Sequence, residues 1–89
     1  MEQENLISYK VLNKGLNKRQ ADLVGFLYSK ENVEINITSY SQKYEVVRQT
    51  ARKDLNELIN AGLIIENKDG RNVIFKITSI ENIDRYLNQ

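Results

Sequence analysis

The chain has 89 residues, of which 40% are hydrophobic and 28% are charged, and it contains neither histidine nor cysteine. A chain of this length has room for one domain with a modest core. The missing thiols and imidazoles exclude disulfides and remove the commonest general base and the usual transition-metal ligands. No pair of carboxylates has a spacing that demands acid/base chemistry, so we expect a protein that is not an enzyme and needs no cofactor or metal.

Charge and hydropathy bear on partners and location. The 13 basic and 12 acidic residues give a net charge of +1, so affinity for a polyanion depends on where the charges lie. The apolar runs are far shorter than the roughly 20 residues that cross a bilayer, and the acidic start Met1-Glu2-Gln3-Glu4 differs from a basic secretory signal. We expect no membrane contact and a cytoplasmic location.

The first predicted elements are two helices. Apolar residues recur at helical spacing over 4–13, which predicts a short frayed helix or arm that ends near Asn13. Asn17 and Gln20 then stand at the two ends of a capping box, in which each side chain bonds the backbone of the other residue. The apolar residues that follow predict a first core helix that ends at about Lys30.

The next segment predicts a very short strand and a short helix. Apolar and polar residues alternate over 33–37, which is the period of a strand, before Asn36 or Thr38 caps the helix. Tyr40 and Tyr44 share one face of this helix. We expect both rings to pack in the core rather than to stack on nucleic-acid bases.

The spacing from Ser41 to Ala51 is that of a helix-turn-helix. Ser41 and Ala51 are small enough for two helices to cross closely, Glu45 stands at the turn, and the apolar Val46 follows it. The two helices on either side of this turn are therefore expected to pack at a steep angle.

The second helix of this pair has the strongest helical pattern in the chain, from about Arg48 to Ala61. Gly62 follows in the position where only glycine enters the left-handed region without steric cost, and Leu63 can then contact Leu58 in a Schellman motif. The buried stripe of this helix is expected to consist of Ala51, Leu55, Leu58 and Ile59.

The chain then changes from a helical to a strand period. The two strand-like runs are residues 63–67 and 72–77. Asp69-Gly70 between them is among the strongest short hairpin signals, and we expect it to be the two-residue loop. Both faces of the hairpin are then apolar, and a further element must cover the second face. The expected cross-strand pairs are Ile64 with Phe75 and Ile65 with Ile74.

The tail supplies a candidate for that cover. Thr78 and Glu81 form another capping box, which predicts a C-terminal helix with Ile80, Ile83 and Leu87 along one side. The order of elements predicts an α+β fold, a winged helix-turn-helix with a three-helix core and a β-hairpin wing, and additional N- and C-terminal helices. The expected divisions are an N-terminal arm or helix over 1–15, a winged helix-turn-helix domain over 16–77 and a C-terminal helix over 78–89.

A family resemblance rests on three stretches of the chain. They are Leu16-Asn17-Lys18-Arg19-Gln20, Arg48-Gln49-Thr50-Ala51-Arg52-Lys53-Asp54-Leu55 with Leu58, Gly62 and Leu63, and Asp69-Gly70-Arg71. On these residues the chain resembles the C-terminal winged-helix domain of bacterial Fic-family proteins, and the stretch from Thr50 to Leu55 is similar to DeoR-type repressors. The resemblance implies a transcriptional regulator or an accessory DNA-binding domain. The Fic catalytic motif needs His and Pro, and this chain has neither.

Two positions depart from the pattern of such domains. They usually carry glycine in the turn and serine as the N-cap of the second helix, where this chain has Glu45 and Val47. Loss of a serine cap costs about 1 kcal/mol, and Glu45 places a negative charge near the expected approach of a phosphate.

The predicted function is binding of double-stranded DNA. Polar and basic residues lie off the buried stripe of the second helix, on the face that enters a major groove. In that groove arginine can bond guanine, and Gln or Asn can bond adenine. Two cations flank the wing tip, where phosphate or minor-groove contacts are expected. The candidate residues are Arg48, Gln49, Thr50, Arg52, Lys53 and Asn56 on the helix, and Lys68 and Arg71 on the wing.

Other interpretations of the same residues remain open. The outer face of the helix could be a solvated surface on which Asp54 and Glu57 balance the cations, and Lys18 and Arg19 at the start of the first core helix could either meet a phosphate or have no role. The alternative function is a protein-protein interaction or dimerisation module without DNA affinity. A homodimer would then form through the terminal helices, with Ile83 and Leu87 as contacts. A small catalytic domain is the third alternative.

Overall fold

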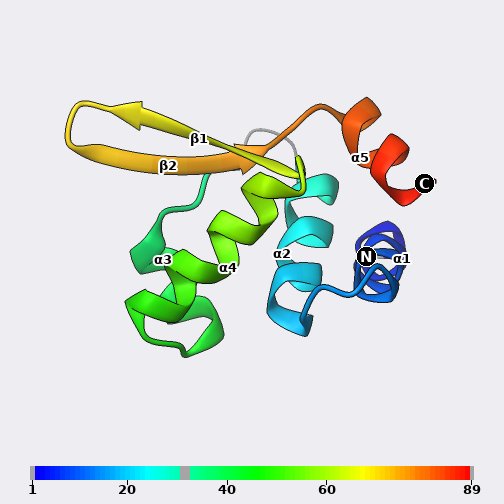
Figure 1. Cartoon of the computed structure of the whole chain (residues 1–89), viewed down its shortest axis with the longest axis horizontal. Helices are drawn as coiled ribbons and strands as arrows, with labels where there is room; N and C mark the ends of the chain where they lie inside the picture. Colours follow the sequence, from blue (N-terminus) through cyan, green and yellow to red (C-terminus); the bar gives the residue numbers. More distant parts are fainter. Residues whose placement is uncertain (1, 31–32, 89) are drawn as a thin grey trace.

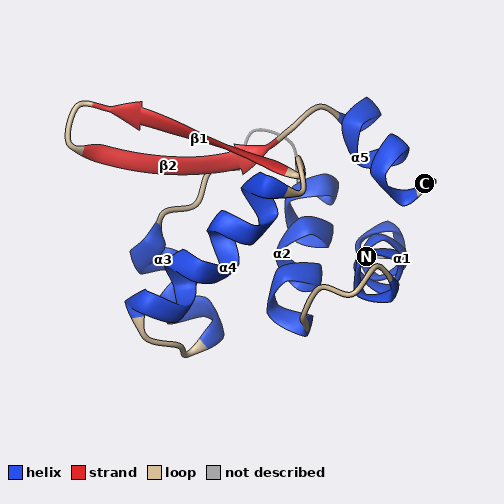
Figure 2. Ribbon diagram, in the orientation of Figure 1, coloured by secondary structure: helices blue, strands red, loops and turns tan. Residues whose placement is uncertain are grey.

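The computed structural model describes residues 2–30 and 33–88 of the chain. Over these residues it has five helices and a two-stranded antiparallel hairpin (Figures 1 and 2). No helix within the described residues has the length and apolar character that a bilayer crossing requires. The elements are α1 Glu2–Asn13, α2 Lys18–Ser29, α3 Ile37–Tyr44, α4 Arg48–Asn60, β1 Ile64–Asp69, β2 Asn72–Ile77 and α5 Ile80–Leu87.

The starts of α2 and α3 follow from local capping. Asn17 accepts a hydrogen bond from the amide of Gln20, whose side chain accepts one from the amide of Asn17, so the predicted capping box is confirmed. Asn36, rather than Thr38, caps α3. The alternating residues before α3 make a single bridge to the hairpin, which is the very short strand that their period predicts.

The end of α4 is the predicted Schellman motif. Gly62 has a φ of +79°, in the left-handed region that favours glycine. The amide of Leu63 donates to the carbonyl of Leu58 at 3.1 Å, and that of Gly62 donates to Ile59 at 2.9 Å. This reversal directs the chain from α4 into β1.

The hairpin register differs from the expected one. Both predicted partners, Phe75 for Ile64 and Ile74 for Ile65, are wrong by two positions. The observed pairs run from Ile64 with Ile77 and Ile65 with Lys76 to Asp69 with Asn72. Because the shift is even, each side chain keeps its predicted face, and Ile64 and Phe75 both enter the core.

The shift comes from the turn, whose two loop residues are Gly70 and Arg71 rather than Asp69 and Gly70. Gly70 has a φ of +63° and occupies the first loop position, where a type II′ turn requires a positive φ. A loop that began at Asp69 would instead place a residue with a Cβ in that conformation. The steric freedom of glycine therefore sets the register.

The tail does not cover the second face of the hairpin, so that expectation is wrong. Ile65 remains 43% exposed there. The predicted cap is also displaced by one residue, because the side chain of Ser79, not Thr78, accepts from the amide of Asn82. From this start, α5 turns Ile83 into the main core, where it is fully buried.

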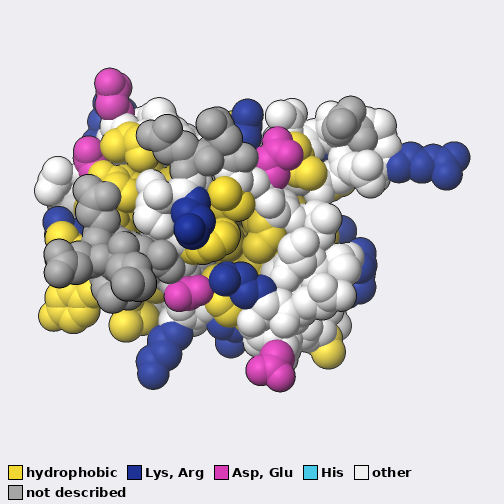
Figure 3. Space-filling model, turned by 180° about the vertical axis from the view of Figure 1, so that it is seen from behind, with side chains coloured by type: hydrophobic (Ala, Val, Ile, Leu, Met, Phe, Trp, Pro, Cys, Tyr) yellow, Lys and Arg dark blue, Asp and Glu magenta, His cyan; other side chains and the backbone are white. Residues whose placement is uncertain are grey.

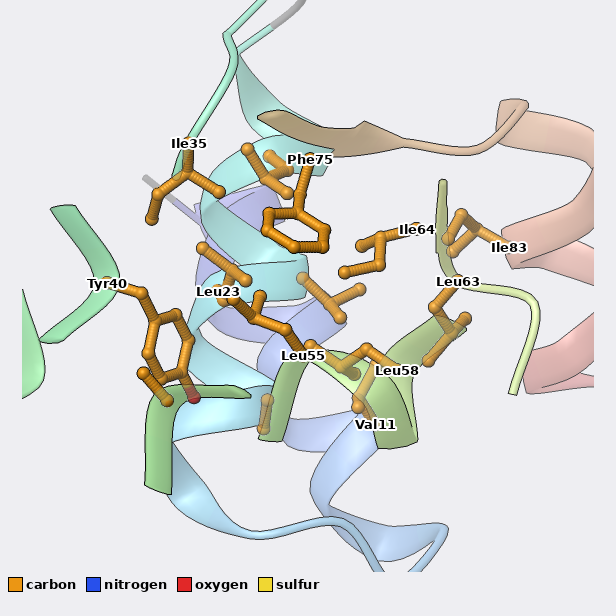
Figure 4. Close-up of a cluster of buried hydrophobic side chains, with 14 of the residues drawn as sticks. Val11, Leu23, Ile35, Tyr40, Leu55, Leu58, Leu63, Ile64, Phe75 and Ile83 are labelled. Atoms are coloured by element: carbon orange, nitrogen blue, oxygen red, sulfur yellow. The ribbon is translucent and has the colours of Figure 1, made fainter. Parts of the chain in front are cut away.

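One core holds the three central helices, the inner face of the hairpin and both terminal helices (Figure 4). Val11 of α1 and Ile83 of α5 are fully buried in it, together with Leu55 and Leu58 of α4. The terminal helices lie at the opposite end of the molecule from the hairpin loop (Figure 1). The first helix is therefore part of the packed body and not a free arm.

Candidate nucleic-acid interface

The turn between α3 and α4 is held by backbone geometry. Glu45 ends α3 with φ +54° and ψ +48°, which is the left-handed conformation, and the amide of Val46 donates to the carbonyl of Ser41 at 3.0 Å. Val47 is the N-cap of α4, makes no side-chain capping bond and is 68% exposed. The two positions that depart from the family pattern are thus a strained residue and an uncapped helix start.

The inner and outer sides of α4 carry different residues. The predicted stripe is buried at Ala51, Leu55 and Leu58, and Ile59 is half-buried. The candidate DNA-binding residues of α4 are all exposed except for the half-buried Thr50, and both wing candidates are exposed. At about 100° per residue, the outermost positions of α4 are Gln49, Lys53 and Asn56.

The wing-side flank of α4 carries two arginines that meet a third from the hairpin. Arg48, Arg52 and Arg71 line one open hollow of about 300 Å³. Nη1 of Arg48 donates to the hydroxyl of Thr38 at 2.8 Å, which orients this guanidinium along the flank. Lys68 does not line the hollow. The full lining is Asn36, Ile37, Thr38, Arg48, Arg52, Arg71, Asn72 and Val73.

Asp54 is not on the solvated face, so its expected role in balancing the outer cations is wrong. Its side chain is 3% exposed and lies between α2, α3 and α4. It accepts from Nε of Arg19 at 2.7 Å, from the hydroxyl of Tyr40 at 2.8 Å and from Nδ2 of Asn17 at 3.1 Å. These donors satisfy a buried carboxylate that would otherwise be strongly unfavourable.

The pKa values of this cluster follow from its contacts. Burial alone would raise the pKa of the Asp54 carboxyl, but the hydrogen bonds from Arg19, Tyr40 and Asn17 outweigh it and hold that pKa below its usual range. Burial, followed by the hydrogen bond to Asp54, raises the pKa of Tyr40. The hydrogen bond to Asp54 likewise raises the pKa of Arg19. Asp54 is therefore charged and structural.

Glu57, the other acid of α4, is exposed but is hydrogen-bonded to α2. Nε2 of Gln20 donates to Oε1 of Glu57 at 2.8 Å and to the backbone carbonyl of Asp54 at 3.1 Å. Across the described part of the chain, no carboxylate lies within ion-pair distance of Arg48 or Arg52. The cations of the outer face are thus available for an external anion.

The cations at the start of α2 do not belong to this surface. Arg19 is committed to Asp54, so a phosphate contact by this side chain is not supported. Lys18 lines a separate hollow against α1, together with Tyr9 and Leu12. The structure therefore brings Arg48, Arg52 and Arg71 together and leaves Lys18 elsewhere.

Sequence reasoning missed the buried polar network of α4, although a signal for it exists. Ala51, Asp54, Leu55 and Leu58 have the spacing of one continuous helix face. An acid on that face predicts a buried carboxylate that needs donors from neighbouring elements.

The terminal helices carry most of the exposed large apolar side chains. Lys or Arg side chains project from the hairpin end, and apolar side chains lie at the end formed by the terminal helices together with charged ones (Figure 3). The exposed apolar residues on those helices are Leu6, Tyr9, Leu12 and Ile80.

This arrangement defines a winged helix-turn-helix, with α3 and α4 around the turn and the hairpin as the wing. Residues 19–76 match the family model of the DeoR-like helix-turn-helix domain. The chain belongs to the family of DeoR-like helix-turn-helix domains. A helix-turn-helix places its second helix in the major groove of DNA, and DNA binding by a regulator of this class is the predicted function.

Among solved structures, the chain is similar to reduced HlyU from Vibrio cholerae, with 20% identity, 97% of this chain and 87% of that chain covered, and a TM-score of 0.65. It is similar to MepR from Staphylococcus aureus, with 17% identity, coverage of 98% and 67%, and a TM-score of 0.68. A MepR mutant bound to an oligodeoxyribonucleotide has 16% identity, coverage of 98% and 67%, and a TM-score of 0.69. Among curated proteins, no sequence matches this chain.

These likenesses confirm the predicted winged-helix fold. The identities are too low to carry residue roles from one protein to the other. The DeoR-type resemblance of the stretch from Thr50 to Leu55 is confirmed by the family match. The Fic-family resemblance is not shown and stays a prediction.

Proposed function

We propose that the chain binds double-stranded DNA through the outer face of α4 and the wing, as the DNA-binding domain of a transcriptional regulator. The observation that carries this proposal is the separation of charge on α4. Asp54 is buried on the inner side and bonded to Arg19, and the exposed Glu57 accepts a hydrogen bond from Gln20. Arg52 and Lys53 are exposed without a carboxylate partner among the described residues. A polyanion then meets cations that no internal ion pair neutralises.

The residue roles follow from position on α4. Gln49, Lys53 and Asn56 form the outermost strip and would reach base edges in a major groove. Thr50 is half-buried on the flank of α4 that faces away from the wing, where its hydroxyl would contact the sugar-phosphate backbone of the DNA. Lys68 on the exposed part of the wing would contact a neighbouring phosphate.

The fold of the relatives supports this proposal. MepR is a transcription regulator of a multidrug efflux pump, and one of its mutants has been solved with an oligodeoxyribonucleotide. The proposed DNA-binding unit is residues 16–77, flanked by α1 and α5. A place in a Fic-family protein, a cytoplasmic location and the lack of enzyme activity stay predictions.

Fluorescence anisotropy with labelled duplexes at low salt tests the proposal. Wild-type protein is expected to bind, and Lys53→Ala is expected to weaken binding by about tenfold. Arg85→Ala is the matched control, because it removes the same charge from an exposed position on α5. The proposal fails if wild-type protein does not bind, or if both variants lose the same affinity.

A homodimer through the terminal helices is the second proposal, and the structure changes its contacts. Ile83 is fully buried within the chain, so its expected role in a dimer interface is wrong, and Leu87 is half-buried. The exposed Leu6 and Tyr9 on α1 are better candidates, because they are 52% and 64% exposed. Sedimentation equilibrium should show a dimer that Leu6→Glu weakens, and a monomer at high concentration would contradict it.

A further inference from the structure

The hollow between α4 and the wing is rich in arginine. Three of its eight lining residues are arginines, and none is acidic. Arg48 and Arg52 come from one flank of α4, and Arg71 comes from the hairpin loop. Residues that lie 19 to 23 positions apart in the sequence thus surround one space of about 300 Å³.

Two further features favour a negative charge in this hollow. Ile37 and Thr38, the first residues of α3, also line it, so the positive end of that helix dipole lies at its wall. Arg48 is held by the hydroxyl of Thr38 at 2.8 Å, which fixes one guanidinium before any ligand arrives. Preorganised donors lose less freedom on binding than mobile ones.

The way in which a helix and a wing dock on a duplex indicates a phosphate as the anion. When a helix lies in the major groove and a wing lies over the adjacent minor groove, one sugar-phosphate backbone runs between them. The hollow is lined by residues of α4 and of the hairpin loop, so it lies where that backbone would pass.

We propose that this hollow holds one backbone phosphate of the bound DNA, between Arg48, Arg52 and Arg71. The inference rests on the proposed DNA-binding function and refines it. The arginines position the duplex, and sequence is read by Gln49, Lys53 and Asn56. This division differs from a direct reading of guanine by Arg48 or Arg52.

Methylphosphonate scanning tests the proposal on the full chain. Each phosphate of a bound duplex is replaced in turn by a neutral methylphosphonate, and the dissociation constant is measured by anisotropy. One position, or two adjacent positions on one strand, should weaken wild-type binding by about tenfold. The same substitution should have little effect on the double variant Arg52→Gln/Arg71→Gln, because that variant has already lost the contact.

A control separates this contact from a general charge effect. Arg85→Gln/Lys14→Gln removes the same charge from surfaces away from the hollow, and it should keep the full effect at the sensitive phosphate. Circular dichroism should show that both double variants are folded, as expected for changes at exposed side chains. The phosphate assignment is wrong if every methylphosphonate substitution weakens binding by the Arg52→Gln/Arg71→Gln variant as much as it weakens binding by wild-type protein.

The ranking of DNA sequences distinguishes positioning from base reading. Arg52→Gln should weaken all duplexes by a similar factor and keep their order. A change of the preferred base at one position would show that Arg52 reads that base, and it would overturn the proposal while DNA binding itself stands. Absence of wild-type binding would overturn the function and this inference together.

A titration with inorganic phosphate distinguishes a site for a DNA backbone phosphate from a site for a free, small-molecule phosphate. The Nε–Hε signals of Arg52 and Arg71 can be followed by NMR as phosphate alone is added. A backbone site should show weak, millimolar binding, because a free phosphate lacks the rest of the duplex. Saturation at micromolar phosphate would indicate a small-molecule site and would contradict the DNA assignment.

Discussion

The inner side of α4 and the turn that leads into the same helix are stabilised very differently. On the inner side, Asp54 is buried with three side-chain donors, and Gln20 ties the same segment to α2. At the turn, Glu45 has a left-handed backbone and Val47 leaves the helix start uncapped. The helix is therefore anchored at its middle, whereas its start lacks a side-chain cap and follows a strained residue.

This difference suggests that the middle of α4 serves stability and that its start serves function. The anchored middle fixes the direction of α4 relative to α2 and α3. In helix-turn-helix proteins the start of the second helix is the end that enters a major groove, and strained or suboptimal residues in proteins concentrate at functional sites.

Loss of Asp54 should have the largest effect. Asp54→Ala leaves the hydroxyl of Tyr40 and the guanidinium of Arg19 without their shared acceptor in a buried site. The free energy of unfolding should fall by about 3 kcal/mol, measured by urea denaturation. Glu34→Ala, at an exposed position, should change it by less than about 0.5 kcal/mol. An equal loss of stability in both variants would contradict the claim that Asp54 anchors α4.

Acid should weaken the same anchor. The pKa of Asp54 in the folded protein lies below that of an unfolded chain, about 3.9. Its stabilising contribution is therefore complete above about pH 4 and is lost as the pH falls through the lower folded value. The free energy of unfolding of wild-type protein should fall over this range, and Asp54→Asn should show a shallower fall. If the free energy of unfolding falls equally with pH in the two proteins, Asp54 is not a source of the acid sensitivity.

Replacing Glu45 in the turn with glycine should make the folded protein more stable. Glu45→Gly removes the Cβ from a residue with φ +54°. The left-handed conformation costs a non-glycine residue about 1–2 kcal/mol, although glycine also gains freedom in the unfolded chain, so a net stabilisation of about 1 kcal/mol is expected. Glu45→Ala, which keeps the Cβ, is the control and should give no such gain in thermal unfolding.

A serine cap should give a similar or smaller gain. Val47→Ser supplies a hydroxyl that can accept from the free amides of the first turn of α4, and it removes an exposed apolar side chain. The free energy of unfolding should rise by about 0.5–1 kcal/mol. Val47→Ala removes the apolar surface without the cap, so a gain of equal size in that variant would show that capping is not the cause.

Local signals in the sequence predicted most of the fold. The capping box at Asn17, the Schellman motif at Gly62 and the order of helices and strands depend on neighbours along the chain, and the structure confirms them. The hairpin register was wrong because the loop follows the conformation of Gly70 rather than the Asp-Gly dipeptide.

The candidate site was less predictable, because it depends on packing between distant segments. Asp54 meets Arg19, 35 positions earlier in the chain, and no local pattern pairs the two. The approach of Arg71 to Arg52 likewise depends on how the hairpin lies over α4. Periodicity predicts the exposure of the outer face of α4 and the burial of Asp54, whereas the donors that meet Asp54 depend on how distant segments pack.

The central claim is that the outer face of α4 and the wing form the DNA-binding surface. Backbone amide shifts, followed by NMR as an unlabelled duplex is added at low salt, test it most directly. The largest changes should fall on residues 48–56 and 68–72, with little change on α1 and α5. Changes centred on the terminal helices, or none at any DNA concentration, would contradict the account.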